Sequence, residues 1–229
     1  MHPVLTPLRG GLIVSCQAYP GEPMRHPETM AQVAEAVVAG GAAAVRVQGL
    51  ADIAFVKGRV EVPVIGLWKD GSHGVYITPT LRHARAVRDA GAEIIALDGT
   101  RRPRPDGLTL AETVAVLRAE GSTPIMADCA DLADAVAAEQ AGVDVVGTTL
   151  AGYAGDRPAT DGPDLALVAQ MADRIGLPVI AEGRVHSPAQ ARAALDAGAF
   201  AVVVGTAITH PTTLTRWFVA GLGDEPAPR

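Results

Sequence analysis

The chain has 229 residues, of which 48% are hydrophobic and 19% are charged, so it is long enough to bury one large core. Its 19 Lys and Arg residues against 25 Asp and Glu residues give a formal net charge of −6, which argues against non-specific binding to nucleic acid or to an anionic membrane. Two cysteines, Cys16 and Cys129, are too few for a disulfide scaffold or a four-ligand zinc site, and no apolar run reaches the roughly 18 residues of a membrane span.

Eight short apolar runs rich in β-branched residues predict strands buried on both faces, as the strands of a parallel sheet are. In chain order they are Leu12–Cys16, Ala43–Val47, Pro63–Leu67, Glu93–Asp98, Pro124–Asp128, Asp144–Thr148, Pro178–Glu182 and Ala201–Val204. Ala-rich segments with helical periodicity separate most of them, namely Glu28–Ala39, Leu81–Ala90, Leu110–Ala119, Asp131–Ala141, Pro163–Arg174 and Pro188–Ala197. The segment Gly49–Arg59 is short and is the weakest helix prediction.

A weak internal repeat supports this alternation of helix and strand. Glycine closes four of the helices and opens the next strand, in Ala39-Gly40-Gly41-Ala42, Ala90-Gly91-Ala92, Ala141-Gly142-Val143 and Ala197-Gly198-Ala199. Glycine relieves the left-handed turn that often ends a helix. Eight βα units in a chain of this length predict an α/β fold, a single (β/α)₈ barrel domain over residues 1–229, with 1–10 and 223–229 as flexible or covering termini.

The carboxyl ends of the predicted strands are unusually polar, and in a (β/α)₈ barrel these ends surround the active site. In order they are Ser15-Cys16-Gln17, Arg46-Val47-Gln48, Lys69-Asp70, Asp98-Gly99-Thr100, Asp128-Cys129, Thr148-Thr149, Glu182-Gly183-Arg184 and Gly205-Thr206. A single charged strand end would be ordinary surface. Because so many polar or charged strand ends lie on one rim of the barrel, they predict a polar active site.

Lys69 and Glu182 form the most informative pair among these residues. Lys69 follows the third strand and Glu182 ends the seventh, so we expect them to face each other across the mouth of the barrel. An acid and a base on opposite sides of a substrate are what inversion of a carbon centre requires. A Lys–Glu ion pair and a Schiff-base lysine are the alternatives.

Glycines after the last two strands predict a phosphate site, although tight turns also need glycine. Gly183, Gly205 and Thr206 lie where such barrels often bind phosphate. The loop Gly152–Pro163 is long and rich in Gly, Asp and Pro, and it could be a mobile lid. No His spacing matches a metal site, so we predict none.

Several strings in fixed order carry a resemblance over most of the chain, from Leu12 to about Phe218. They are LIVSCQAYPGEPM, VYITPTL, GAEIIALDGTRRPRPDG, MADC, GTTLAGY, VIAEGRVHSPAQA and GAFAVVVGTAIT. Together they resemble the N-acylglucosamine-6-phosphate 2-epimerases, also called N-acetylmannosamine-6-phosphate 2-epimerases. The resemblance implies a (β/α)₈ barrel of amino-sugar and sialic acid catabolism, which interconverts the two N-acetylhexosamine 6-phosphates without a metal or nucleotide cofactor.

The resemblance also implies roles for individual residues. It assigns catalysis to Lys69 and Glu182 and substrate binding to a group comprising Gln17, Arg46, Asp128, Tyr153 and Arg184. It adds His210 to Gly183, Gly205 and Thr206 as the predicted phosphate-binding residues. The chain departs from the family at Lys69-Asp70-Gly71, where Lys-Arg-Asp is usual, at His210, where Arg is usual, and at Ala151, where Ser is usual.

Two other functions stay open from the residues alone: isomerisation or aldol cleavage of another phosphosugar, and phosphosugar binding without catalysis. The resemblance implies a homodimer that binds a small phosphosugar. The composition predicts a cytoplasmic protein that binds neither nucleic acid nor membranes. Trp217-Phe218, among very few aromatic residues, suits a subunit contact or a final helix packed on its own barrel.

Overall fold

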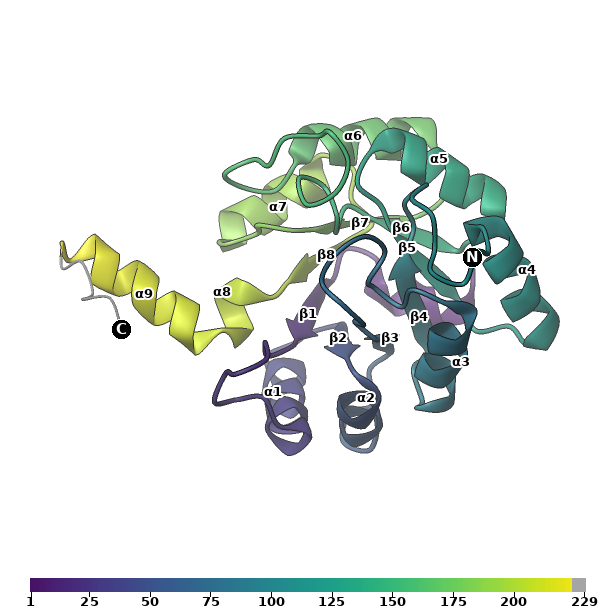
Figure 1. Ribbon diagram of the computed structural model, residues 1–229. Coiled ribbons are helices and arrows are strands. Elements are labelled where there is room, and N and C mark those ends of the chain that lie inside the picture. Colours follow the sequence, from purple (N-terminus) through teal and green to yellow (C-terminus); the bar gives the residue numbers. More distant parts are fainter. Residues whose placement is uncertain (224–229) are drawn as a thin grey trace.

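Eight parallel strands pair in sequence order, and β1 pairs with both β2 and β8, so the sheet closes into a barrel (Figure 1). The structure is a computed structural model that describes residues 1–223. The strands are β1 (Leu12–Cys16), β2 (Ala44–Gln48), β3 (Val64–Leu67), β4 (Ile94–Asp98), β5 (Ile125–Asp128), β6 (Val145–Gly147), β7 (Val179–Glu182) and β8 (Ala201–Val204). The predicted (β/α)₈ barrel is confirmed.

Helices follow the strands, and all but the last two surround the barrel (Figure 1). They are α1 (Pro27–Ala39), α2 (Leu50–Lys57), α3 (Leu81–Asp89), α4 (Leu110–Glu120), α5 (Leu132–Ala141), α6 (Leu165–Arg174), α7 (Pro188–Asp196), α8 (Thr206–Thr209) and α9 (Pro211–Gly221). The weakest helix prediction is confirmed as α2. The predicted starts of α5 and α6 are slightly early, because Asp131 and Asp164 are N-caps whose carboxylates accept backbone N–H bonds instead of continuing the helix.

The glycines of the internal repeat do what their position predicts. Gly41, Gly91, Gly142 and Gly198 all have positive φ, between 85° and 105°. Only glycine adopts this conformation without a steric penalty, so these residues allow each helix to reverse into the next strand within a short loop.

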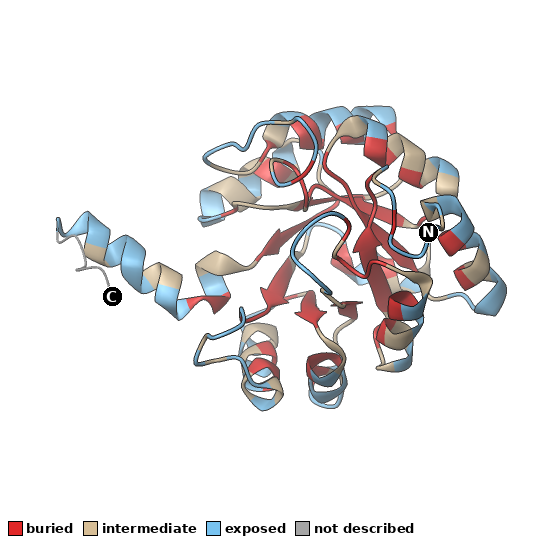
Figure 2. Ribbon diagram, in the orientation of Figure 1, coloured by how far each residue is buried: buried red, intermediate tan, exposed pale blue. Residues whose placement is uncertain are grey.

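Apolar residues pack in two layers, which Figure 2 shows as buried strands inside a ring of half-buried helices. Side chains that point into the barrel, such as Ile13, Ile65 and Ile94, form an inner cluster. A 3₁₀ helix that the sequence did not predict, η1 (Pro3–Leu8), adds the fully buried Leu5 and Leu8 to this cluster. Side chains that point outward pack against the helices.

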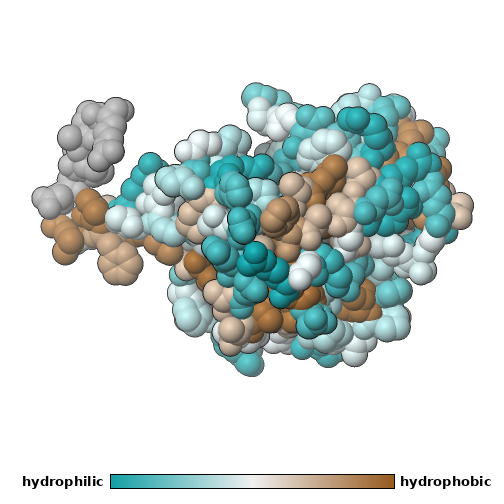
Figure 3. Space-filling view, turned by 90° about the horizontal axis from the view of Figure 1, so that it is seen from below, coloured by the Kyte–Doolittle hydropathy of each residue, from teal (hydrophilic) through white to brown (hydrophobic). Residues whose placement is uncertain are grey.

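The helix α9 extends away from the barrel (Figure 1). None of its residues is buried, and Phe218 is 77% exposed. Figure 3 shows apolar side chains gathered on this projecting part of the molecule. Trp217 nevertheless contacts its own barrel, because its ring centre lies 4.8 Å from that of His186 on the β7–α7 loop. Both predicted roles of Trp217-Phe218 therefore stay open, the contact with the barrel through Trp217 and a subunit contact through Phe218. Of the predicted C-terminal tail 223–229, residues 224–229 lie outside the described residues.

Within residues 1–223, none of the helices combines the length and the apolar character that crossing a bilayer would require.

Candidate active site

A pocket of about 700 Å³ lies at the carboxyl ends of the strands. Polar side chains from the ends of β1, β2, β3 and β7 line it, among them Gln17, Arg46, Gln48, Lys69 and Glu182. Strand ends far apart in the sequence therefore meet in one place, as the polar rim predicted. Its volume suits a small, sugar-sized ligand.

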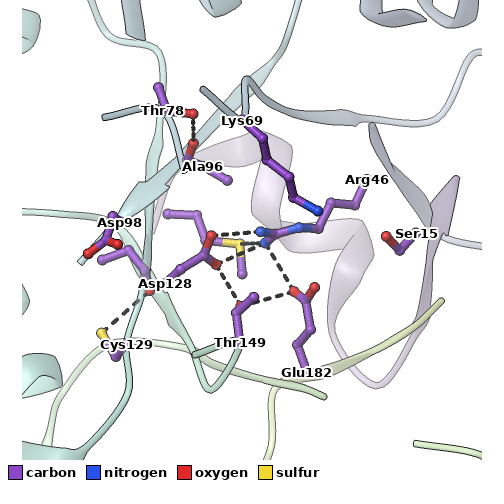
Figure 4. A network of polar contacts seen from close by, with 12 residues as sticks. Ser15, Arg46, Lys69, Thr78, Ala96, Asp98, Asp128, Cys129, Thr149 and Glu182 are labelled. Atoms are coloured by element: carbon purple, nitrogen blue, oxygen red, sulfur yellow. Dashed lines mark hydrogen bonds and ion pairs between the residues drawn. The ribbon is translucent and has the colours of Figure 1, made fainter. Parts of the chain in front are cut away.

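A buried guanidinium organises the floor of this pocket (Figure 4). Arg46, on β2, is 1% exposed and donates two hydrogen bonds to Asp128 of β5, at 3.0 and 2.6 Å. Its Nη1 also lies 3.0 Å from Glu182 Oε2, at the end of β7. Thr149 Oγ1 lies 2.6 Å from Asp128 Oδ1 and 3.1 Å from Glu182 Oε2. One cation and one hydroxyl thus hold two carboxylates that would otherwise repel each other.

Lys69 approaches the same network from another side of the pocket (Figure 4). Its Nζ donates a 2.9 Å hydrogen bond to Gln17 Oε1, and Gln17 in turn donates to Ser15 Oγ at 2.8 Å. Within residues 1–223 no ion pair joins Lys69 to Glu182, because Glu182 pairs with Arg46 instead. The alternative of a Lys69–Glu182 ion pair is therefore wrong.

Burial shifts the pKa values of the two groups in opposite directions. It lowers the pKa of Lys69, and the nearby charge of Arg46 lowers it further, while Glu182 and Asp128 partly oppose the shift. Burial raises the pKa of Glu182, against the opposing charge of Arg46. An amine that loses its proton more easily and a carboxyl group that keeps its proton longer are suited to exchange protons with a substrate near neutral pH.

The acidic residue next to Lys69 points out of the pocket. Asp70 Oδ2 lies 3.1 Å from His83 Nε2 on α3, and the Asp70 backbone N–H donates to Tyr76 O at 3.0 Å. Asp70 is not part of the pocket lining. The chain has Lys69-Asp70-Gly71 where the family usually has Lys-Arg-Asp, and the carboxylate of Asp70 therefore does not enter the pocket.

Arg184 connects the pocket to the Gly152–Pro163 loop. Its guanidinium donates to Ala151 O at 2.9 Å, Gly162 O at 3.2 Å and Thr160 Oγ1 at 3.1 Å, and its Cζ lies 5.2 Å from the centre of the Tyr153 ring. Both Arg184 and Tyr153 line the pocket. The guanidinium is thus already engaged by the loop, and the lid role of the loop stays a prediction.

The residues predicted for the phosphate line the same pocket, near β7, β8 and α8. Gly183 has φ 112°, which favours glycine, and at Gly205 a Cβ would lie 3.2 Å from Ser15 Cβ. His210 is buried, its ring centre is 4.8 Å from that of Tyr19, and its Nδ1 is 3.7 Å from Glu22 Oε1.

Asp128 is placed differently from its predicted role in substrate binding. It is fully buried beneath Arg46 and does not line the pocket. Both of its oxygens are taken by the Arg46 guanidinium, and Thr149 adds a further bond. Asp128 thus holds Arg46, which itself faces the pocket, and its role in substrate binding stays a prediction.

Some lining residues were not singled out from the sequence. Gln48 Oε1 accepts a bond from the Lys69 backbone N–H at 3.3 Å, and Thr149 contacts Glu182 as described above. Tyr19 and Tyr76 also line the pocket, together with Tyr153, which the sequence analysis had named, so all three tyrosines of the chain lie there. Only 3% of the residues are aromatic, and this rarity of aromatic residues was the signal by which the sequence could have indicated the tyrosines as pocket residues.

No group of three His, Cys, Asp or Glu side chains within residues 1–223 is arranged to hold a metal ion. The polar groups of the pocket include an amine, guanidinium groups, a carboxyl group, amides, hydroxyls and imidazoles, which suit proton transfer and anion binding.

Comparison with known proteins places these features in context. A family model described as "Putative N-acetylmannosamine-6-phosphate epimerase" matches residues 30–224. A "Putative N-acetylmannosamine-6-phosphate 2-epimerase" of Cutibacterium acnes is 61% identical over 217 residues, covering 94% of this chain and 95% of that protein. The solved N-acetylmannosamine-6-phosphate 2-epimerase from Clostridium perfringens has a TM-score of 0.92 at 38% identity, covering 96% of both chains. Thiamine phosphate pyrophosphorylase from Pyrococcus furiosus, with a TM-score of 0.61 at 15% identity and 93% of both chains covered, shares the fold alone.

Proposed function

The chain belongs to the N-acetylmannosamine-6-phosphate epimerase family, and from this premise we propose that it is an isomerase that inverts C2 of an N-acetylated hexosamine 6-phosphate. The reaction interconverts N-acetylmannosamine 6-phosphate and N-acetylglucosamine 6-phosphate. The observation that carries the proposal is one pocket containing both a half-buried amine with a lowered pKa and a carboxyl group with a raised pKa.

The chemistry begins with the open-chain form of the sugar. Its aldehyde acidifies the hydrogen on C2, the carbon that carries the N-acetyl group. Lys69 and Glu182 act as base and acid: one removes this proton, and the other returns a proton to the opposite face of an enolate-like intermediate. Their separate bonding partners, Gln17 for Lys69 and Arg46 for Glu182, support independent roles.

Negative charge develops on O1 as the C2 proton leaves. Arg46 is the donor best suited to stabilise it, because its guanidinium lines the pocket and is already held rigidly by Asp128. Gln17 is the second candidate, through its contact with Lys69. A donor that is fixed before the reaction costs little reorganisation in the transition state.

The remaining assignments concern the substrate's other groups and the setting of the enzyme. Gly183, Gly205, Thr206 and His210 bind the 6-phosphate, while Tyr153 and Arg184 cover the sugar. The enzyme acts in the cytoplasm, in amino-sugar and sialic acid catabolism, and uses no cofactor.

We further propose that the protein is a homodimer in which α9 packs against a second copy of the chain. The proposal is supported by the exposed apolar side chains of this helix, Phe218 at 77% and the neighbouring Leu222 at 81%. An apolar helix that leaves its own barrel can bury this surface on a partner.

Proton NMR of each epimer incubated with the protein in heavy water tests the proposed reaction. We expect each epimer to gain one deuterium at C2 and to convert to the other with its carbon skeleton unchanged. Cleavage into smaller carbonyl compounds would indicate an aldolase, and a ketose product would indicate a different isomerase. Binding without any exchange would indicate a non-catalytic phosphosugar-binding protein.

A further inference from the structure

Thr78 is a fully buried residue with a strained backbone, and it lies in the β3–α3 loop that carries Lys69. Its φ is 45°, in the left-handed region that a β-branched residue rarely adopts. Such strain persists only where the surrounding structure holds it, and it is common close to functional sites. Glycine would relieve the strain, so the presence of threonine points to a role for its hydroxyl.

Every polar group of Thr78 has a hydrogen-bond partner. Its Oγ1 donates to Ala96 O of β4 at 2.7 Å (Figure 4) and accepts from the Trp68 backbone N–H at 3.1 Å. Its backbone N–H donates to Trp68 O at 2.8 Å, and its C=O accepts a 3.0 Å bond from Arg104 Nη2. Arg104 is itself buried and donates to Asp98 O at 2.8 Å. Thr78 is therefore anchored to β4 and to the β4–α4 loop, and it holds Trp68 through two bonds.

Trp68 directly precedes Lys69, so these contacts reach the peptide group that joins the two residues. The C=O of this peptide group, Trp68 O, accepts the bond from Thr78, and its N–H, that of Lys69, donates to Gln48 Oε1 at 3.3 Å. An antiparallel bridge also pairs Lys69 with Ile77, the neighbour of Thr78. Because both sides of the peptide group are held, the Lys69 side chain starts from a fixed position and in a fixed direction.

We propose that Thr78 is a positioning residue for Lys69, whose hydroxyl fixes the backbone from which the amine extends into the pocket. The inference rests on the proposed function for the role of Lys69, and it deepens that function by naming what sets the place of the amine. The amine must reach the C2 hydrogen, and a displacement of about 1 Å can cost roughly 100-fold in rate. Thr78 does not line the pocket, so it acts through Lys69 and not on the substrate.

The turnover of Thr78→Val and Thr78→Ser tests the proposal. Valine keeps the shape of threonine but leaves Trp68 N–H and Ala96 O without this partner, whereas serine keeps the hydroxyl. We expect kcat to fall about 100-fold in Thr78→Val with little change in the Michaelis constant, and Thr78→Ser to keep most of the wild-type kcat. The control Thr113→Val removes an equally buried hydroxyl on α4 and should keep both constants. A wild-type kcat in Thr78→Val would overturn the proposal.

The place of the amine can also be followed without turnover, because the two lysines of the chain are Lys57 and Lys69. Protein labelled at lysine Cε with a heavy carbon isotope gives two NMR signals, which Lys57→Ala assigns, and their change with pH reports each pKa. Burial and Arg46 lower the pKa of Lys69 in its present place. An amine that leaves this place is less buried, so we expect its pKa to rise in Thr78→Val and to stay at the wild-type value in Thr78→Ser. A loss of kcat with an unchanged pKa of Lys69 would overturn the proposal.

Thr78→Gly provides the same test if Thr78→Val does not fold. Glycine removes the hydroxyl and relieves the strained backbone at once, so we expect the same loss of kcat and the same rise in the pKa of Lys69. Wild-type values of both in Thr78→Gly would overturn the proposal. Because the NMR titration needs no turnover, a rise in the pKa of Lys69 in a protein whose wild type does not epimerise would reject the proposed reaction and keep the positioning role of Thr78.

Discussion

Arg46 is the residue on which the site depends, because this buried cation contacts two carboxylates at once. A guanidinium suits this position, since it matches a carboxylate with two parallel hydrogen bonds. Asp128 takes that two-bond contact, and Glu182 shares one nitrogen of the same group. The geometry leaves Glu182 able to change its protonation state while Asp128 keeps Arg46 fixed.

Replacement of Asp128 by Asn tests whether Asp128 is the residue that fixes Arg46. The change leaves a buried guanidinium with one carboxylate partner, so we expect the free energy of unfolding to fall by about 3 kcal/mol, measured by urea denaturation. The matched control is Asp196→Asn, which removes a carboxylate from the exposed Arg192–Asp196 pair and should cause no measurable change. Equal stability of both variants with wild type would contradict the role of Asp128.

The pH dependence of turnover follows from the two shifted pKa values. In the proposed mechanism the active protein holds one proton between Lys69 and Glu182, so we expect kcat/KM to depend on pH as a bell-shaped curve in both directions of the reaction. Activity is lost at low pH because Glu182 becomes protonated while Lys69 is still protonated. Activity is lost at high pH because Lys69 loses its proton while Glu182 is already ionised. The raised pKa of Glu182 and the lowered pKa of Lys69 make the bell narrower than for an exposed pair.

The variant Thr149→Val tests whether Glu182 controls the acid limb of the pH profile of kcat/KM. The hydroxyl of Thr149 helps to lower the pKa of Glu182, so its removal should move the acid limb to higher pH. Thr113→Val removes a buried hydroxyl on α4, far from the pocket lining, and serves as the control with an unchanged profile. An acid limb that stays in place in Thr149→Val would show that Glu182 does not control it.

At the scale of elements, the strands and most helices could be predicted because each signal is local. β-Branched runs, glycine at helix ends and cap residues such as Asp131 act within a few positions. The contact of Arg46 with Asp128 joins residues 82 positions apart. Both faces of a barrel strand are buried, so the sequence does not show which side chains point inward. That is why Asp128 was expected in the pocket lining and lies beneath it.

The two ends of the chain were harder to predict for another reason. The helix η1 contains Pro7 and buries only Leu5 and Leu8, so it has no helical periodicity to detect. The helix α9 has its apolar residues exposed, and no local rule distinguishes a helix that packs on its own barrel from one that projects. The sequence left both possibilities open at Trp217-Phe218, and the three-dimensional arrangement places Trp217 against the barrel and leaves Phe218 exposed.

The Gly152–Pro163 loop gives a prediction at the scale of an element. Arg184→Gln removes the guanidinium that bonds Ala151, Thr160 and Gly162, so the loop must be ordered anew when substrate binds. We expect the Michaelis constant to rise roughly tenfold, which corresponds to the loss of one charge-assisted hydrogen bond. Limited proteolysis should cut this loop faster than in wild type. Arg192→Gln on α7 is the control, and unchanged values for Arg184→Gln would argue against the contact's role.

At the scale of the whole molecule, the exposed helix α9 predicts the assembly. Light scattering coupled to gel filtration should give the mass of a dimer for wild type and of a monomer for Phe218→Glu. A charge placed at the centre of an apolar contact cannot be buried without a large penalty. Phe55→Glu changes an equally apolar residue, 47% exposed on α2, and should remain a dimer. A monomeric wild type would contradict the proposed dimer.

The proposed reaction requires that the amine of Lys69 moves the C2 proton. The chain offers a close control, because its two lysines are Lys69 in the pocket and Lys57 on the surface, paired with Glu93. Proton NMR in heavy water should show C2 exchange of both epimers by wild type and by Lys57→Ala. Lys69→Ala should be folded and should exchange neither epimer. Exchange by Lys69→Ala at the wild-type rate would contradict the account.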